Sequence, residues 1–327
     1  MMRVLPIVVK RWGGVMAAVA LVGCAEAPIV ETKPVPPAVE AVIPEAVPLP
    51  ETAASAAARA YYAQVQQGLL AQGLLRTDGG GTDTPYTDRM LADNFIRVAL
   101  YDEYERSNDT TVQRQTISTL RRWAAPVRVG LRFGASVSPQ MRATDTARVG
   151  SYLQRLQGIT GHPIRLDDNR PNFWVYIVSE DERQALGPVL RAAMPGLTAN
   201  DVSGITAMPR STYCIVYAQS AGSSGVYTAA FAVIRAEHPD LLRMSCIHEE
   251  IAQGLGLPND SPKARPSIFN DDEEFALLTT QDEMLLRMLY NPALRPGMTE
   301  ATAGPIVETL ARRLTDGDGY ALAGIEE

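Results

Sequence analysis

The sequence predicts one α+β domain with a mixed β-sheet, preceded by a mainly helical N-terminal part. After Pro126, short apolar runs that alternate with period two are interleaved with stretches of helical composition. Before that point, residues 51–122 have mainly helical composition. We therefore assign residues 51–122 to the helical part, 123–315 to the α+β domain and 316–327 to an acidic tail.

Three helices are expected in the N-terminal part. The first covers residues 52–75, although Gly68 and Gly73 lower its helix propensity. A glycine-rich loop, 77–85, follows and lacks the context of a phosphate-binding loop. Apolar residues at helical spacing predict the second helix at 87–105, and composition favours a third at 110–122.

The α+β domain begins with a strand at Val127–Phe133, because polar and apolar residues alternate there. The pattern then predicts a helix at 145–158, a strand pair at 164–166 and 173–178, and a helix at 181–194.

The second half of this domain starts with a β-hairpin. Two strands, 212–218 and 226–234, flank a Gly-Ser-Ser-Gly sequence at 222–225 that is typical of a turn. A helix around 244–257 follows. A capping box, Thr280-x-x-Glu283, opens a helix at 281–290, and composition predicts a last helix at 299–314.

The N-terminus has the features of a bacterial lipoprotein signal. Basic residues precede a short apolar stretch, 15–22, which ends in Leu21-Val22-Gly23-Cys24. This ending resembles a lipobox, which implies removal of residues 1–23 and acylation of Cys24, for example with palmitate. An uncleaved anchor and an ordinary signal peptide are the alternatives. Residues 24–50, rich in Pro and Ala, are expected to be a tether that holds the domain off the membrane.

The residue after Cys24, the net charge and the remaining cysteines indicate the compartment of the protein and the class of partner it does not bind. Ala25, and not aspartate, follows the cysteine, so the resemblance to a lipobox implies an outer-membrane lipoprotein that faces the periplasm and not one retained at the inner membrane. The chain has a net charge of −7, and removal of 1–23, with three basic residues and no acidic one, leaves −10. Nucleic acid is therefore not an expected partner. Cys214 and Cys246 remain as an even pair, which favours a disulfide in an oxidising compartment over two free thiols.

The helix around 244–257 has two different faces. Ile247, Ile251 and Leu255 form an apolar stripe, whereas Glu249 and Gln253 lie on the opposite face. His248 does not begin a zinc-binding HExxH motif, because the residue four positions later is alanine. We expect His248 to be a packed histidine at the edge of the core stripe.

Residues 246–260 have the residue spacing of a zinc-peptidase active-site helix, but other residues stand at the positions of the metal ligands. When the helix is aligned at Gly256, Glu249 takes the first ligand position, Glu250 the general base, Gln253 the second ligand and Asn259 the third. Ser267-Ile268-Phe269 is similar to a Met-turn with phenylalanine in place of methionine.

On these motifs, the chain resembles a proteobacterial family of uncharacterised lipoproteins with a degenerate metzincin-like domain. In that family E-E-x-x-Q-x-x-G-x-x-N-D stands in place of the zinc motif. The resemblance covers roughly 120–300 and is specific mainly in 246–290. It implies a zincin-type fold for residues 123–315, with a mixed sheet and a helix of the active-site type.

Three interpretations of the polar residues remain open. Glu249 and Gln253 can form a hydrogen-bonded pair that holds the turn at Asn259 and Asp260. The same oxygen atoms suit a hard cation such as Ca²⁺ or Mg²⁺. Glu249 and Glu250 can also act as an acid/base pair, although adjacent carboxylates on a helix project about 100° apart.

The first functional hypothesis is non-catalytic binding of a peptide or envelope protein in the former substrate cleft, under the strand before this helix, without metal or cofactor. The second is an atypical metal-dependent hydrolase, a peptidase with Glu250 as general base. The third is a purely structural envelope protein. An exposed edge strand would separate the first hypothesis from the third.

Overall fold

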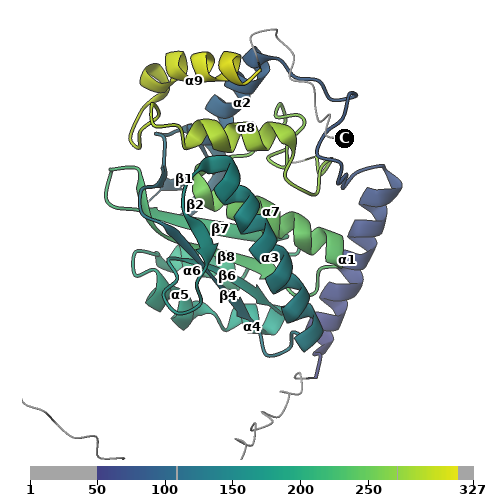
Figure 1. Ribbon diagram of the computed structural model, residues 1–327. Helices are drawn as coiled ribbons and strands as arrows, with labels where there is room; N and C mark the ends of the chain where they lie inside the picture. Colours follow the sequence, from purple (N-terminus) through teal and green to yellow (C-terminus); the bar gives the residue numbers. More distant parts are fainter. Residues whose placement is uncertain (1–49, 108–109, 271, 316–327) are drawn as a thin grey trace, which may run out of the picture. The chain divides into compact units, whose positions relative to one another are not determined.

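The computed structural model describes residues 50–107, 110–270 and 272–315 (Figure 1). The expected signal peptide, the acylated Cys24, nearly all of the tether and the acidic tail lie outside the described residues. A search of the described helices for one long and apolar enough to cross a membrane found none.

A mixed six-stranded sheet is the centre of the fold, with the order β3-β8-β6-β4-β5 and with β7 paired to β8. All its pairings are parallel except that of β7 with β8. The strands are β3 (Arg122–Trp123), β4 (Val127–Phe133), β5 (Ile164–Leu166), β6 (Phe173–Val178), β7 (Cys214–Ser220) and β8 (Val226–Arg235).

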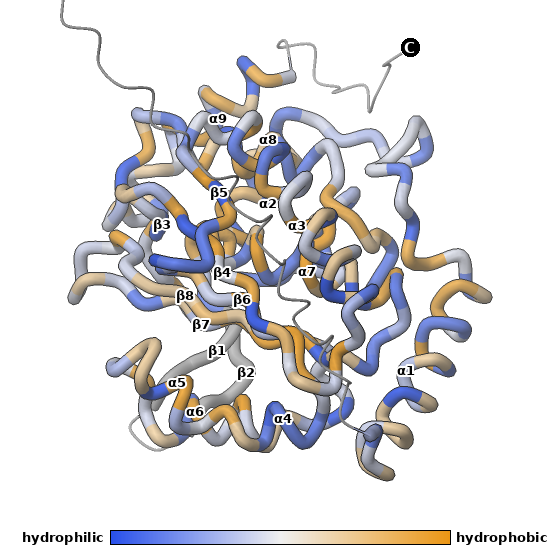
Figure 2. The backbone as a smooth tube through the Cα atoms, turned by 60° about the horizontal axis from the view of Figure 1, so that its bottom comes forward, coloured by the Kyte–Doolittle hydropathy of each residue, from blue (hydrophilic) through white to orange (hydrophobic). Residues whose placement is uncertain are grey.

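Helices cover both faces of this sheet (Figure 1). On one face, α3 (Pro139–Thr160) and α7 (Asp240–Gly256) pack on the side chains of Val129, Val175 and Ala232. On the other face, α4 (Glu180–Gln184), α5 (Gly187–Ala193) and α6 (Ala199–Thr206) enclose a smaller core around Phe231 and Val233. Figure 2 shows the hydrophobic strands between the two helical layers.

Four further helices complete the described part of the domain. α2 (Asp88–Ala99), α8 (Thr280–Leu289) and α9 (Glu300–Leu314) pack together and extend the core on the α3 and α7 side. α1 (Ala53–Ala71) contributes Ala58 and Tyr62, which pack on Leu242 at the start of α7.

The helix predicted at 110–122 is wrong, and the helix predicted at 87–105 ends at Ala99. An antiparallel hairpin, β1 (Tyr101–Ser107) and β2 (Thr110–Ile117), occupies this part of the chain. Thr110, Thr111 and Val112 are β-branched and favour a strand, a preference that the overall composition of the segment had concealed.

Other expectations are met with smaller corrections. The predicted strand pair does not pair with itself, because β5 and β6 lie on opposite sides of β4. The predicted helix 181–194 is broken before Gly187-Pro188 into α4 and α5, and α6 was not foreseen. The capping box of α8 starts at Thr279 with Asp282, one residue earlier than expected. The strand at Val127–Phe133, the hairpin β7–β8 and the last helix form as predicted.

Candidate functional site

The polar residues predicted on α7 are largely enclosed by the protein. Glu250 is 4% exposed and Gln253 is 9% exposed, whereas Glu249 is half-buried. The Gln253 side-chain amide donates a 3.0 Å hydrogen bond from Nε2 to Oδ1 of Asp260. Gln253 and Asp260 therefore come together, which agrees with the expected role of Gln253 in holding this turn, whereas the expected pair of Glu249 with Gln253 stays a prediction.

Asn259 does not join this cluster. Its side-chain Nδ2 donates to the Arg97 carbonyl at 2.8 Å, and its backbone N–H donates to the Val98 carbonyl at 3.2 Å. Asn259 thus satisfies carbonyls at the end of α2, which otherwise lack helical partners. Within the described residues, no group of three or more His, Cys, Asp or Glu side chains is arranged to hold a metal ion.

His248 is a packed histidine, as predicted. Its Nδ1 accepts a hydrogen bond from the Leu278 backbone N–H at 3.1 Å, and its ring stacks on Tyr152 with 3.9 Å between centroids. Burial lowers its pKa from 6.5 to about 3, and nearby Arg155 acts in the same direction. The other histidines, His162 and His238, each bond a backbone carbonyl elsewhere.

A disulfide between Cys214 and Cys246 joins β7 to α7. The predicted pairing of these two cysteines is therefore present in the structure. The bond connects the first residue of β7 to the middle of the helix that carries Glu249 and Gln253. Strand and helix are thus held together by a covalent bond in addition to packing.

β7 is an edge strand. Among the described strands it pairs only with β8, and all seven of its residues are half-exposed. The strand immediately before α7 is β8, which has neighbours on both sides and cannot accept another strand. The free edge therefore belongs to β7 and not to the strand immediately before α7, and the predicted cleft stays a prediction.

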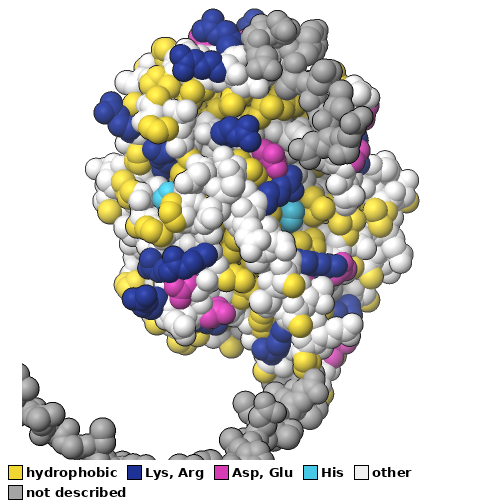
Figure 3. Space-filling view, in the orientation of Figure 1, with side chains coloured by type: hydrophobic (Ala, Val, Ile, Leu, Met, Phe, Trp, Pro, Cys, Tyr) yellow, Lys and Arg dark blue, Asp and Glu magenta, His cyan; other side chains and the backbone are white. Residues whose placement is uncertain are grey.

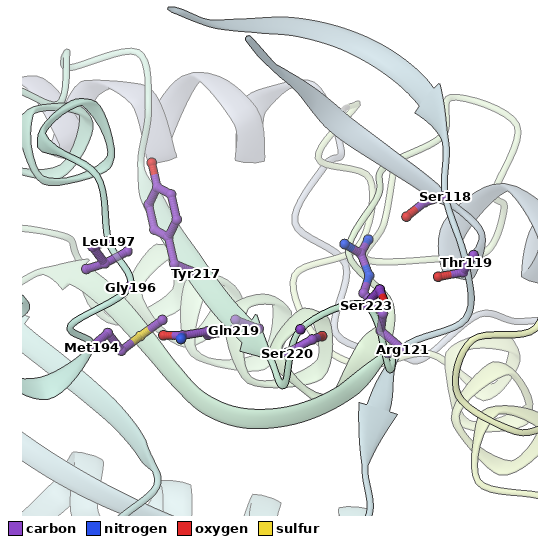
Figure 4. Close-up of a pocket in the computed structure, with 13 residues that line it drawn as sticks. Ser118, Thr119, Arg121, Met194, Gly196, Leu197, Tyr217, Gln219, Ser220 and Ser223 are labelled. Carbon is purple, nitrogen blue, oxygen red and sulfur yellow. The ribbon is translucent and has the colours of Figure 1, made fainter. Parts of the chain in front are cut away.

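A cavity of about 400 Å³ lies at the C-terminal end of β7 (Figure 4). We call it the edge cavity. Tyr217 and Gln219 lie on one side, and the segment 118–123, which we call the strap, lies across from them. The cavity is lined by Ser118, Thr119, Arg121, Met194, Gly196, Leu197, Tyr217, Ala218, Gln219, Ser220, Gly222, Ser223 and Gly225.

Backbone contacts fix the strap in place. Leu120 exchanges hydrogen bonds with the turn at 297–298, each 2.8 Å, and the Arg122 N–H donates to the Gly225 carbonyl at 3.1 Å. Gly256 ends α7 with φ 129°, and a Cβ there would lie 2.2 Å from the Arg121 carbonyl oxygen. Only glycine allows so close an approach, so the backbones of the strap and of the end of α7 pack directly against each other.

Arg121 is the charged residue of this site that the sequence analysis missed. Its guanidinium points into the edge cavity (Figure 4) and bonds the Asp102 carboxylate. The expectation of a helix at 110–122 hid it, because a helix would have turned the side chains of 118–121 in different directions. A signal was present in the pair Arg121-Arg122 before Trp123, in a chain of net negative charge.

A second cavity, of about 300 Å³, lies at the carboxyl ends of β4 and β6, where open parallel sheets commonly bind ligands. Here the Glu182 carboxylate takes the available donors: the N–H and Oγ of Ser136 and the N–H of Ser179, each at 2.8 Å. Although burial acts to raise the pKa of Glu182, these hydrogen bonds hold it below its ordinary value. These three hydrogen-bond donors of Ser136 and Ser179 are therefore already used by a carboxylate of the protein itself.

The surface seen in Figure 3 has no continuous basic region: Lys and Arg side chains are scattered and interleaved with acidic, apolar and uncharged ones. A nucleic-acid site would gather basic residues on one face. The edge of the sheet, where β7 has a free side and the edge cavity lies at its end, is the best-defined candidate site among the described residues.

Comparison with known proteins places the chain in a family. A family model described as "Protein of unknown function (DUF2927)" matches residues 88–309, from α2 into α9. The match includes the sheet, the strap, the disulfide and α7, and it begins after α1. Neither the curated proteins nor the solved structures gave a significant match. The chain thus belongs to the DUF2927 family.

Proposed function

We propose that this DUF2927 domain is a non-catalytic binding module that takes up an extended peptide segment as an added strand along β7. The observation that carries the proposal is the edge position of β7, with the edge cavity at its end. An edge strand presents backbone N–H and C=O groups that an extended peptide can pair with, while alternate side chains enter pockets.

The setting of β7 favours addition of a strand. Binding to a preformed edge loses less conformational entropy than binding to a mobile one. The Cys214–Cys246 disulfide fixes the start of β7 to α7, and the hairpin to β8 fixes its end. The side chains of Ile215 and Tyr217 also pack toward the small core beneath α5 and α6. The peptide would therefore meet a rigid template.

A metzincin-like origin and a location on the cell envelope belong to the same proposal. The order β4, α3, β5, β6, then the helices α4 to α6, then β7, β8 and α7 is similar to that of the upper subdomain of metzincins. The disulfide suits an oxidising compartment such as the periplasm. A lipid anchor at Cys24 would place the domain near the membrane, with an envelope protein or peptide as its partner.

The test uses N-methylated peptides. A random decapeptide library is selected on the purified chain, and enriched peptides are resynthesised with N-methyl groups at either the odd or the even positions. In an added strand, only alternate N–H groups face the neighbouring strand. One N-methyl series is expected to lose binding, while the other retains it.

Two variants locate the binding. Thr119→Trp fills the edge cavity from the strap and is expected to weaken binding, whereas Ser151→Trp adds the same side chain on the exposed face of α3. Equal binding of both N-methyl series, or equal binding to both variants, would refute strand addition at β7. A library without any enriched peptide would do so as well and would favour a structural role.

A further inference from the structure

Arg121 gives the edge cavity a positive charge. It is the one charged residue among those that line the cavity. Its ion-pair partner Asp102 is not among the lining residues, so Arg121 is the charged group that a ligand in the cavity would meet, with its charge shared with that carboxylate. Its remaining polar lining is neutral and includes the hydroxyls of Ser118, Thr119, Ser220 and Ser223. This lining favours an anionic ligand group.

The hydrogen bonding of Arg121 points to a planar anion. A guanidinium carries five N–H donors in a fixed fork, which matches the two oxygens of a carboxylate. Nη2 of Arg121 bonds Asp102, and the side chain is 23% exposed. Its Nε is buried and has no hydrogen-bond partner among the described residues. A ligand carboxylate would therefore bond the exposed part of the guanidinium, which it would share with Asp102.

The position of the cavity favours the end of a peptide. The pairing of β7 with β8 shifts register between Gln219 and Ser220, so the regular ladder stops there. Beyond that point the strap crosses the end of β7 (Figure 4), and its backbone is held by the turn at 297–298 and by Gly256. A peptide added along β7 therefore meets the strap and has no straight path past it.

The rim of the cavity suits an apolar last side chain. Met194 and Leu197, in the loop between α5 and α6, line the cavity across from the strap (Figure 4). An apolar side chain packed against them would bury apolar surface.

We propose that the edge cavity binds the C-terminal carboxylate of a peptide, that Arg121 is its receptor, and that the peptide runs parallel to β7. This inference rests on the proposed strand addition and adds to it a ligand class and a direction. An aspartate or glutamate side chain carries the same chemical group, so the test must separate an internal carboxylate from a terminal one.

The probes are two libraries of decapeptides with identical random sequences, one ending in a free carboxylate and one in a carboxamide. Binding to the purified chain is quantified by mass spectrometry, and affinities of enriched peptides are measured by fluorescence polarisation. Free-acid peptides are expected to bind at least about tenfold more tightly than their amides, because a charge-assisted bidentate contact is lost.

Three variants assign the effect to Arg121. Arg121→Gln is expected to remove the preference for the free acid over the amide. Asp102→Asn removes the competing carboxylate and is expected to keep or increase the preference. Arg155→Gln is the matched control, because Arg155 also pairs with one carboxylate, that of Glu283, but lies on α3.

The two proposals fail in different ways. If free acids and amides bind equally and one N-methyl series still loses binding, the carboxylate inference is wrong and strand addition stands. A preference that persists in Arg121→Gln, or that follows internal aspartate and glutamate in the amide library, also overturns the inference. If no peptide of either library binds, strand addition itself is wrong.

Discussion

Protonation of His248 should destabilise this protein at mildly acidic pH. In the folded state, Nδ1 accepts the Leu278 N–H at 3.1 Å and the ring is stacked on Tyr152. A proton on Nδ1 would break that hydrogen bond and place a charge in a site where the side chain is 6% exposed. The pKa therefore falls from 6.5 to about 3 on folding, mainly through burial.

The sign and size of the effect follow from this difference. Between pH 6.5 and about 3, the unfolded chain binds a proton at His248 that the folded chain does not. Stability contributed by the neutral histidine is therefore present above pH 6.5 and is lost as the pH falls. At pH 5 the loss is about 2 kcal/mol, and any folded pKa well below 5 gives nearly the same number.

Urea unfolding at pH 7.5 and pH 5.0 measures this loss. For His248→Gln the decrease in the free energy of unfolding between these pH values should be smaller than for the wild type by about 2 kcal/mol. Tyr152→Phe is the control, because it removes the hydrogen bond to the His248 carbonyl and keeps the ring stack. It should lower stability equally at both pH values. An unchanged pH dependence in His248→Gln would refute the neutral, buried state.

Three further predictions concern the disulfide, Gly256 and the metal content of the protein. Reduction of the disulfide between Cys214 and Cys246, 32 residues apart, should lower the free energy of unfolding by about 4 kcal/mol; equal urea midpoints with and without reductant would contradict this. Gly256→Ala should cost at least about 2 kcal/mol in the same assay, because its Cβ would meet a strap carbonyl at 2.2 Å, and an unchanged midpoint would disprove the close contact. Elemental analysis of protein purified without chelator should find no stoichiometric metal, because the Gln253 amide is already hydrogen-bonded to a carboxylate. A metal that is lost in both Glu249→Ala and Gln253→Ala would favour the alternative hypothesis of a metal-dependent hydrolase.

The local sequence pattern was sufficient to predict those helices and strands in which the periodicity of apolar residues agrees with their burial. Val127–Phe133 alternates in sequence and is a sheet strand, and the hairpin around 222–225 forms between β7 and β8 as its turn residues indicate. The segment 101–117 was misassigned because β-branched residues there compete with a charged, helix-like composition. Whether such a segment forms a strand or a helix depends on whether a second segment pairs with it. The sequence of one segment alone does not contain that information.

The candidate site was only partly predictable for a similar reason. The contact between Gln253 and Asp260 and the packing of His248 follow from helix geometry and a short turn, so the sequence is enough. Arg121 enters the site because four glycines, at 225, 254, 256 and 297, lie against the strap or beneath it, and these are distant in sequence. Only the folded chain shows that these positions surround one segment.

The way α7 uses its polar residues explains why the edge of the sheet is the better candidate for binding. His248 joins α7 to α3 and to the loop before α8, Gln253 holds the turn after the helix, and Asn259 holds the end of α2. Glu249 and Glu250 also have interaction partners within the protein. His248, Gln253 and Asn259 serve the packing around α7, so a ligand at these groups would have to displace an internal contact. At β7, a ligand would instead supply a contact that the described structure lacks, a neighbour for the edge strand.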